Sequence, residues 1–124
     1  MQSSNEKFKS DLKRRIYLWT LTIIKLLKKL PKNYVFEVLG KQLLRSGSSI
    51  LANFVEAQAA SSRKDFTNFI NHSLKSANES KVWLSLIKDS IGDEQIKKDL
   101  GILLKESIEI SNILGKTMTT LRNK

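Results

Sequence analysis

Proline occurs once and glycine five times in this chain of 124 residues, so very few positions can interrupt a helix. The glycines are also too sparse to supply the tight turns that a β-sheet of this length would need. Hydrophobic residues make up 40% of the sequence and charged residues 27%, a balance typical of a folded domain. The chain is therefore predicted to be all-α and to form a single domain over residues 1–124.

Apolar residues recur at intervals of three and four along four segments, which is the spacing that places side chains on one face of a helix. The predicted helices cover approximately residues 6–30, 33–60, 63–90 and 93–121. Along the first of them the inward positions are Phe8, Leu12, Ile16, Trp19, Ile23, Leu26 and Leu30. Because the repeat stays close to seven residues and the connections are short, the pattern predicts an antiparallel up-down-up-down four-helix bundle.

Residues that start or stop helices stand at the predicted boundaries. Pro31 is expected to end the first helix, and the side chain of Asn33 to cap the second. Ser62 followed by Asp65 fits a capping box and predicts the start of the third helix. Asp93 is expected to cap the fourth helix.

The residues that most enzyme and metal sites require are missing or isolated. The chain has no cysteine and one histidine, His72, which excludes thiolate chemistry and multi-histidine metal centres. The serines have no histidine other than His72 to act as their base, and Gly47 lies inside a predicted helix without the Lys-Ser or Lys-Thr ending of a phosphate loop. Glu56 and Glu79 are single carboxylates, not the paired motifs of di-iron bundles. The protein is expected to be non-enzymatic, with no metal and no cofactor.

The longest apolar run near the N-terminus extends from Ile16 to Leu27 and is interrupted by Lys25. It is not followed by the small residues of a signal cleavage site. A cytoplasmic location is therefore expected.

Positive charge is concentrated near the N-terminus. The formal net charge is +10, and nine of the 22 basic residues fall within the first 32 positions, where only Glu6 and Asp11 oppose them. Five basic side chains of the first predicted helix share a sector of about 100° opposite its apolar face. They are Lys7, Arg14, Lys25, Lys28 and Lys29. Like charges repel one another along a helix, and phosphates would turn that repulsion into attraction, so these five are the candidate nucleic-acid-binding residues.

Two other interpretations of this basic sector stay open. Exposed lysines can serve solubility alone, although the fourth helix shows a balanced arrangement in which carboxylates stand four positions before lysines. These expected pairs are Asp93 with Lys97 and Glu94 with Lys98. A basic amphipathic helix can also lie on an anionic membrane, but the apolar face is needed inside the bundle. No motif that reads bases is present, so contacts to RNA or DNA are expected to be mainly to the backbone.

The second predicted helix is apolar on more than one side. Leu44, Leu51 and Val55 lie about 100° away from its inward residues, a wider apolar surface than one bundle core requires. This surface fits either a broad intramolecular core or an interface between subunits of a homo-oligomer. The subunit interface is the favoured interpretation.

Four polar residues follow the boundary of the same apolar face. They are Arg45, Ser49, Asn53 and Glu56. Arg45 and Glu56 are about 16 Å apart along the helix axis, so each needs a partner on another helix or subunit. The set is interpreted as a structural polar network that fixes the register of packing, with a ligand or catalytic site as the alternative.

The segment that holds these polar residues resembles a known family. It reads QLLRSGSSILANFVEAQ over residues 42–58 and is followed by SRKDF over 62–66, and a later segment reads ANESKVWL over 77–84. Together they are similar to the four-helix bundle family of 23S rRNA intervening-sequence proteins. The resemblance implies an antiparallel four-helix bundle that assembles as a homopentamer and is encoded within insertions in bacterial 23S rRNA genes.

The same fold is similar to that of the accessory protein of diversity-generating retroelements, a basic pentamer that binds a reverse transcriptase and nucleic acid. Taken with the basic sector, these resemblances predict a non-enzymatic, oligomeric accessory protein that binds RNA or DNA. A reverse transcriptase is the kind of protein partner that they suggest. The alternative is an adaptor scaffold that recruits a polymerase or a ribosomal factor without binding nucleic acid itself.

Overall fold

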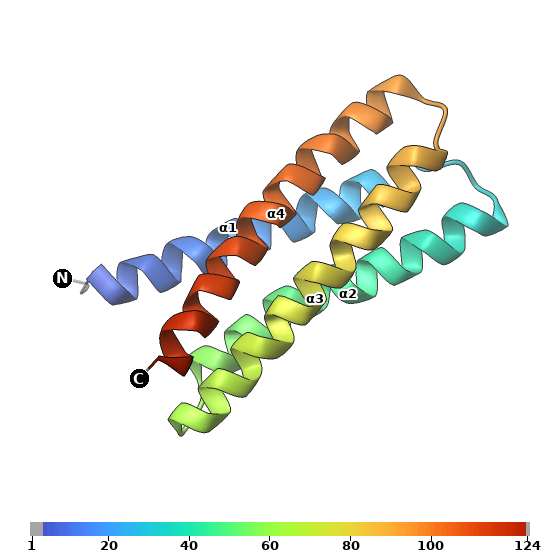
Figure 1. Ribbon diagram of the computed structural model, residues 1–124. Coiled ribbons are helices and arrows are strands. Elements are labelled where there is room, and N and C mark those ends of the chain that lie inside the picture. Colours follow the sequence, from blue (N-terminus) through green and yellow to red (C-terminus); the bar gives the residue numbers. More distant parts are fainter. Residues whose placement is uncertain (1–3, 124) are drawn as a thin grey trace.

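The computed structural model describes residues 4–123, and nearly all of them lie in four helices (Figure 1). The helices are α1 (Ser4–Leu27), α2 (Tyr34–Gln58), α3 (Arg63–Ser90) and α4 (Glu94–Arg122). Each boundary falls within three residues of the one predicted from the sequence. The prediction of an all-α four-helix bundle is confirmed.

Side chains cap three of the helices as the sequence predicts. Asn33, Ser62 and Asp93 each accept a hydrogen bond, at 3.0–3.1 Å, from the backbone N–H three residues later. Each bond satisfies an N–H group that has no partner within its own helix. The caps therefore fix where α2, α3 and α4 begin.

α1 ends earlier than predicted, at Leu27. Pro31 has no N–H, and its ring clashes with the carbonyl of the residue four positions before it, which is Leu27. The chain continues in a tighter turn, where the N–H of Lys29 donates to the Leu26 carbonyl at 2.9 Å. Lys28 and Lys29 consequently lie in the connection after α1 and not within the helix.

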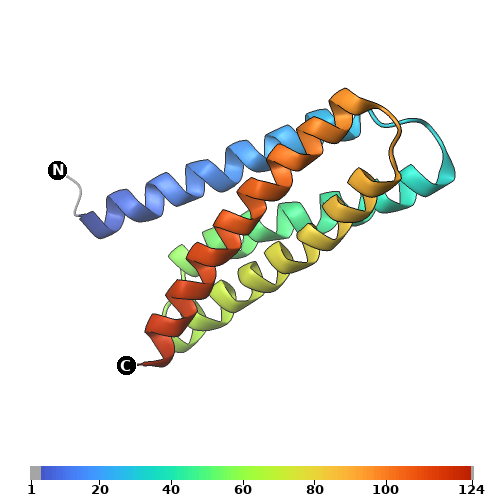
Figure 2. The ribbon, with the colours of Figure 1, turned by 45° about the horizontal axis from the view of Figure 1, so that its top comes forward.

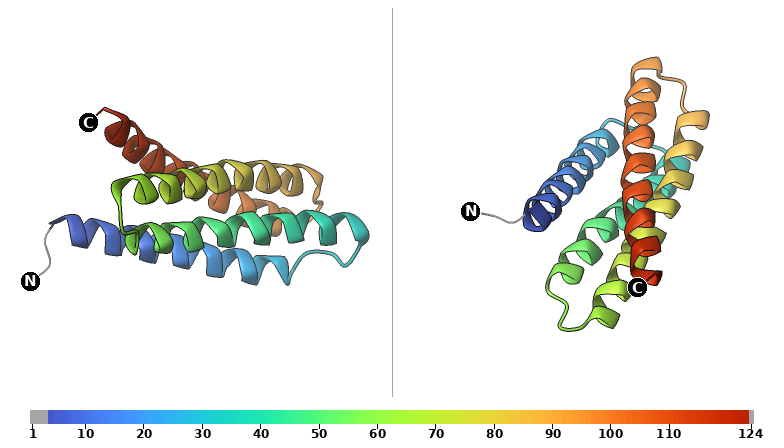
Figure 3. Two further views of the ribbon diagram at one scale, coloured as in Figure 1. Left: turned by 90° about the horizontal axis from the view of Figure 1, so that it is seen from below. Right: turned by 60° about the vertical axis from the view of Figure 1, so that its left-hand side comes forward.

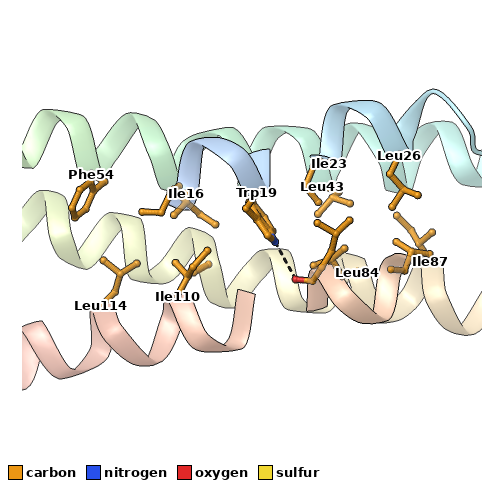
Figure 4. Close-up of a cluster of buried hydrophobic side chains, with 14 of the residues drawn as sticks. Ile16, Trp19, Ile23, Leu26, Leu43, Phe54, Leu84, Ile87, Ile110 and Leu114 are labelled. Carbon is orange, nitrogen blue, oxygen red and sulfur yellow. Dashed lines mark hydrogen bonds between the residues drawn. The ribbon is translucent and has the colours of Figure 1, made fainter. Parts of the chain in front are cut away.

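Consecutive helices run antiparallel, and α4 returns beside α1 (Figures 1 and 2). Buried apolar side chains from all four helices fill the centre, among them Ile16, Leu43, Leu84 and Leu114 (Figure 4). Removing this surface from water is the main favourable contribution to folding. The two connections at residues 28–33 and 91–93 lie at one end of the bundle, and the ends of the described chain lie at the other (Figure 1).

Small polar residues form the contact between α2 and α3. The hydroxyls of Ser46 and Ser80 are hydrogen-bonded at 2.8 Å, and Ser73 donates to the Ile50 carbonyl at 2.8 Å. All three serines are fully buried. Within residues 4–123 every buried side-chain nitrogen or oxygen has a hydrogen-bond partner. These hydrogen bonds compensate for the cost of removing the polar groups from water.

α1 packs more loosely than the other helices, and its N-terminal half diverges from the C-terminal half of α4 (Figure 3). Phe8, which the periodicity places in the core, is 49% exposed, so that prediction was wrong. Periodicity gives the direction of a side chain but not the distance to the helix opposite. The divergence leaves a groove of about 620 Å³ whose lining includes Phe8, Phe54 and Phe66.

Candidate nucleic-acid interface

Core packing determines which side of α1 faces solvent. Leu12, Ile16 and Ile23 are buried, so the opposite side of the helix is exposed. All five candidate binding residues, Lys7, Arg14, Lys25, Lys28 and Lys29, are exposed. Lys7 is 3.7 Å from Asp11 in an exposed ion pair. The other four form no ion pair with any residue of the described range, so they are available to an anionic partner.

The basic sector of α1 is not continuous. Between Arg14 and Lys25, about 16 Å of helix at the usual rise, the outer face carries Tyr17, Leu18 and Ile24, which are exposed. The cations therefore form two groups. The denser group is Lys25, Lys28 and Lys29, named here the α1-end lysines.

Arg15 points away from the basic sector and holds α1 against α4. Its Nε and Nη2 donate to the Glu106 carboxylate at 2.6 and 2.7 Å, and Nη2 also bonds to Glu109. The hydrogen bond from Arg15 holds the pKa of Glu106 below its ordinary value, although partial burial acts in the opposite direction. The same bond raises the pKa of Arg15. This arginine is engaged in a partly exposed ion pair between α1 and α4 and is not part of the candidate interface.

Replacing Arg15 with alanine is expected to lower the free energy of unfolding at pH 7 by about 1 kcal/mol, because a doubly hydrogen-bonded pair is worth more than an ordinary surface pair. Glu106 is more acidic in the folded chain than in the unfolded chain, so its contribution is present above the unfolded carboxylate pKa and is lost as the pH falls through the lower folded pKa. Urea unfolding of the parent and Arg15→Ala at pH 7 and about pH 3 measures both effects. The difference between the two proteins should shrink at the lower pH, and an equal difference at both pH values would contradict this assignment.

The predicted interface residues of α2 are only partly covered. Leu44 and Val55 are 40% and 39% exposed, whereas Leu51 is half-buried and packs against the core. A broad intramolecular core accounts for Leu51 but leaves the other two side chains in contact with water. An apolar surface is thus available on α2.

Apolar residues of α1 extend the same surface. A Cβ atom at Gly47 would lie 3.1 Å from the ring of Trp19, so these two residues mark where α1 and α2 approach each other. In the antiparallel register that follows, Tyr17 and Ile24 of α1 lie close to the levels of Leu51 and Leu44. We call this surface the α1–α2 apolar face; it consists of Tyr17, Ile24, Leu44, Leu51 and Val55.

Of the four polar residues predicted along α2, Arg45 reaches another helix. Its Nη2 pairs with the Glu79 carboxylate of α3, and its Nε and Nη2 donate to Gln42 at 3.3 and 3.0 Å. Glu79 also accepts a hydrogen bond from the Trp83 indole at 2.8 Å. This ion pair holds α2 in register with α3 on the outside of the bundle.

The other three polar residues do not join that cluster. Ser49 donates to the Arg45 carbonyl at 2.8 Å, and Asn53 donates to the Ser49 carbonyl at 2.9 Å. Glu56 is exposed, and its carboxylate bonds to no residue of the described range. The side chains of the four residues are therefore not bonded to one another, because helical Ser and Asn side chains are taken up by carbonyls one turn earlier.

Potential metal ligands do not gather in threes anywhere among residues 4–123, and His72 is exposed on α3. None of the four helices in that range is both long and apolar enough to span a bilayer. The expectation that the protein has no catalytic site and no cofactor stays a prediction.

Comparison with known proteins relates this arrangement to a family. The family model described as 23S rRNA-intervening sequence protein matches residues 9–116. The chain belongs to this family. A crystal structure of a protein of unknown function from the S23 ribosomal protein family of Bacteroides thetaiotaomicron is 34% identical, and the match covers 86% of this chain and 97% of that one, with a TM-score of 0.74. No curated protein sequence matches the chain significantly.

Membership in the 23S rRNA-intervening sequence protein family confirms the resemblance drawn from residues 42–58 and 77–84. The similarity to the accessory protein of diversity-generating retroelements is not addressed by these matches and stays a prediction. Four of the five candidate binding residues fall inside the matched range, and Lys7 lies outside it.

Two lysines of α4 in this member of the 23S rRNA-intervening sequence protein family lack the ion pairs that the sequence predicts. The predicted pairs of Asp93 with Lys97 and Glu94 with Lys98 do not form in the range that the structure describes. The Asp93 carboxylate caps α4 instead, and an exposed pair one turn apart gains too little to hold two long side chains together. Lys97 and Lys98 are therefore not neutralised.

Proposed function

We propose that this family member is a non-enzymatic, oligomeric protein that binds the phosphate backbone of RNA or DNA. The observation that supports this most strongly is the set of α1-end lysines, which are exposed and form no ion pair with residues 4–123 in a chain of net charge +10. Lysine ammonium groups attract phosphates as point charges and need no base-specific geometry. Arg14 supplies a further cation on the same side of α1.

Binding through these residues is expected to depend steeply on salt and weakly on sequence. Each phosphate contact releases counterions condensed on the nucleic acid, so affinity falls as salt rises. Contacts to phosphate orient a protein on nucleic acid but do not report the base sequence. Any specificity for one RNA or DNA would then come from its shape or from a second protein.

The direct test is a titration of fluorescently labelled RNA and DNA with the full chain at 50 and 200 mM salt, followed by fluorescence anisotropy. Four phosphate contacts predict that affinity falls about 50- to 150-fold between these concentrations, from a slope of about 0.7–0.9 per contact. Undetectable binding at 50 mM salt, or affinity that barely changes, would overturn the proposal.

We also propose that a second copy of the chain covers the α1–α2 apolar face. Its exposed apolar residues are in keeping with an interface, and the family resemblance implies a homopentamer. A ring with an odd number of subunits requires two different complementary surfaces on each subunit, so this face would contact another part of its neighbour. Assembly would repeat the α1-end lysines around the ring and strengthen the positive field.

Introducing a charge into this face is expected to break the oligomer and leave the helices intact. Leu51→Glu and Val55→Lys each place a charged group where an apolar contact is proposed. Light scattering after gel filtration measures the mass, and circular dichroism reports the helix content. Lys75→Glu, a change at an exposed residue of α3, serves as the control. A monomeric parent protein, or Val55→Lys of unchanged mass, would contradict the interface.

An adaptor scaffold without nucleic-acid binding is the second candidate function. Leu18 and Ile102 are exposed beside a depression between α1 and α4, which favours a protein partner such as a polymerase, reverse transcriptase or ribosomal factor. Failure of the titration would favour this function. Either function implies the cytoplasmic location expected from the sequence.

A further inference from the structure

A second group of lysines surrounds Ile102 beside the α1-end lysines. A depression of about 580 Å³ on the surface of α3 and α4 is lined by four lysines, which are Lys88, Lys97, Lys98 and Lys105. A neighbouring depression of about 280 Å³ lies between α1 and α4 and is lined by Lys25 and Lys29. Ile102, which is 66% exposed, lines both. Six lysines, from α1 and the connection after it and from α3 and α4, therefore surround one residue.

The packing of α3 against α4 adds Lys88 to this group. The Cε atom of Lys88 lies 3.7 Å from where a Cβ atom of Gly101 would be, which is an ordinary contact distance, so the side chain of Lys88 extends over α4 at this position. Lys98 and Lys105 are seven residues apart on one face of α4, about 10 Å along the axis. That length corresponds to about three nucleotides of one strand at 3.4 Å each.

The charge around Ile102 is strongly positive. Six lysines stand against two carboxylates that line the same depressions, Glu94 and Asp99, which leaves a net charge of +4. Ile102 also lines the depression beside Leu18, which adds Arg15 with Glu106 and Glu109, so the net charge over all three depressions is +3. None of the six lysines forms an ion pair with a residue of the described range. Asp99 accepts a hydrogen bond from Gln95 at 3.0 Å and so is directed toward its own helix. A concave surface with a net positive charge raises the local concentration of polyanions.

We propose that the path of the nucleic acid continues from the α1-end lysines across Ile102 onto α4 and the end of α3, where Lys88, Lys98 and Lys105 bind phosphates. This extension rests on the proposed function, because the same phosphate chemistry is required. It adds three cations that lie outside α1 and widens the contact from one helix edge to one end of the bundle. Lys25, Lys88 and Lys98 lie near the end of the bundle where α1 and α3 end and α4 begins, and Lys105 lies about two turns further along α4.

The test measures binding of a labelled single-stranded RNA of 20 nucleotides at 0.1 M salt. Loss of two phosphate contacts in Lys98→Ala/Lys105→Ala is expected to weaken binding about 25-fold and to lower the salt slope by about 1.4, the values for a single strand. The matched control is Lys64→Ala/Lys75→Ala, which removes the same charge from exposed positions of α3 outside both depressions and should weaken binding less than about threefold. Lys98→Arg/Lys105→Arg keeps the charge and should bind as the parent does.

A third variant, Lys25→Ala/Lys29→Ala, separates this extension from the proposed function. If the parent protein does not bind the RNA, the proposed function and this extension are both overturned. If Lys25→Ala/Lys29→Ala weakens binding but Lys98→Ala/Lys105→Ala has no greater effect than the control, the proposed function stands and the extension is overturned. Weakening by the α4 pair beyond the control supports the extension, provided that circular dichroism shows the same helix content in every variant.

Discussion

Replacing Trp19 with alanine is expected to lower the free energy of unfolding by about 3–5 kcal/mol, the range for deletion of a buried aromatic side chain. Trp19 is 3% exposed, its ring lies beside Gly47 of α2, and its Nε1–H donates to the Leu103 carbonyl of α4 at 3.0 Å (Figure 4). It therefore attaches α1 to both neighbouring helices. Because α1 packs more loosely than the other helices, few other contacts can compensate. Urea unfolding followed by circular dichroism measures the change.

Trp19→Phe is the matched variant for this measurement. It keeps most of the buried apolar surface but removes the indole donor, so a smaller loss of about 1–2 kcal/mol is expected. Val82→Ala, at an exposed position of α3, should change the free energy of unfolding by less than about 0.5 kcal/mol. A loss below about 1 kcal/mol for Trp19→Ala would show that α1 is held by contacts other than this side chain.

Reversing the charge of all three α1-end lysines is expected to weaken nucleic-acid binding by at least about 100-fold at 0.1 M salt, because three phosphate contacts each contribute about five- to eightfold there. The variant is Lys25→Glu/Lys28→Glu/Lys29→Glu. The three side chains are exposed and form no ion pair with residues 4–123, so the fold should be retained. Fluorescence anisotropy with labelled RNA measures the affinity.

The control for charge reversal changes net charge by the same amount elsewhere. Lys64→Glu/Lys75→Glu/Lys116→Glu alters three exposed lysines of α3 and α4 away from the α1-end lysines. It should weaken binding far less, through the long-range field alone. If the two triple variants lose affinity equally, binding follows the total charge of the protein and no particular surface is used.

Much of the fold could be predicted because it depends on local chemistry. The caps at Asn33, Ser62 and Asp93 require a side-chain oxygen three residues before a free N–H, and that requirement is visible in the sequence. The early end of α1 also follows from Pro31, although the predicted boundary placed the last turn inside the helix.

The errors concern contacts between helices. Phe8 has the correct periodicity for the core but is exposed, because α1 and α4 diverge at that end and the crossing of helices is set by packing along their whole length. Similarly, Tyr17, Ile24 and Leu44 can be recognised as parts of one apolar face only when the register of α1 against α2 is known. Neither feature has a signal within a single helix.

The candidate site could be predicted only in part, because some of its residues are brought together by contacts between helices. The exposure of Lys25 follows from the helical spacing of its own segment. The lysines of α4 were interpreted as neutralised because their carboxylates stand at favourable spacing, but capping by Asp93 competes with that pairing. Lys88 of α3 reaches α4 near Gly101 because of the way the two helices pack, which the pattern within each separate helix does not reveal.

Lysine acylation in the presence and absence of bound RNA, read by mass spectrometry, tests the central claim most directly, because it reports which ammonium groups the RNA covers. Lys25, Lys28 and Lys29 should lose reactivity when RNA is added at low salt, and Lys64 and Lys75 should keep theirs. Protection of Lys64 and Lys75 with full reactivity at the three α1-end lysines would contradict the account.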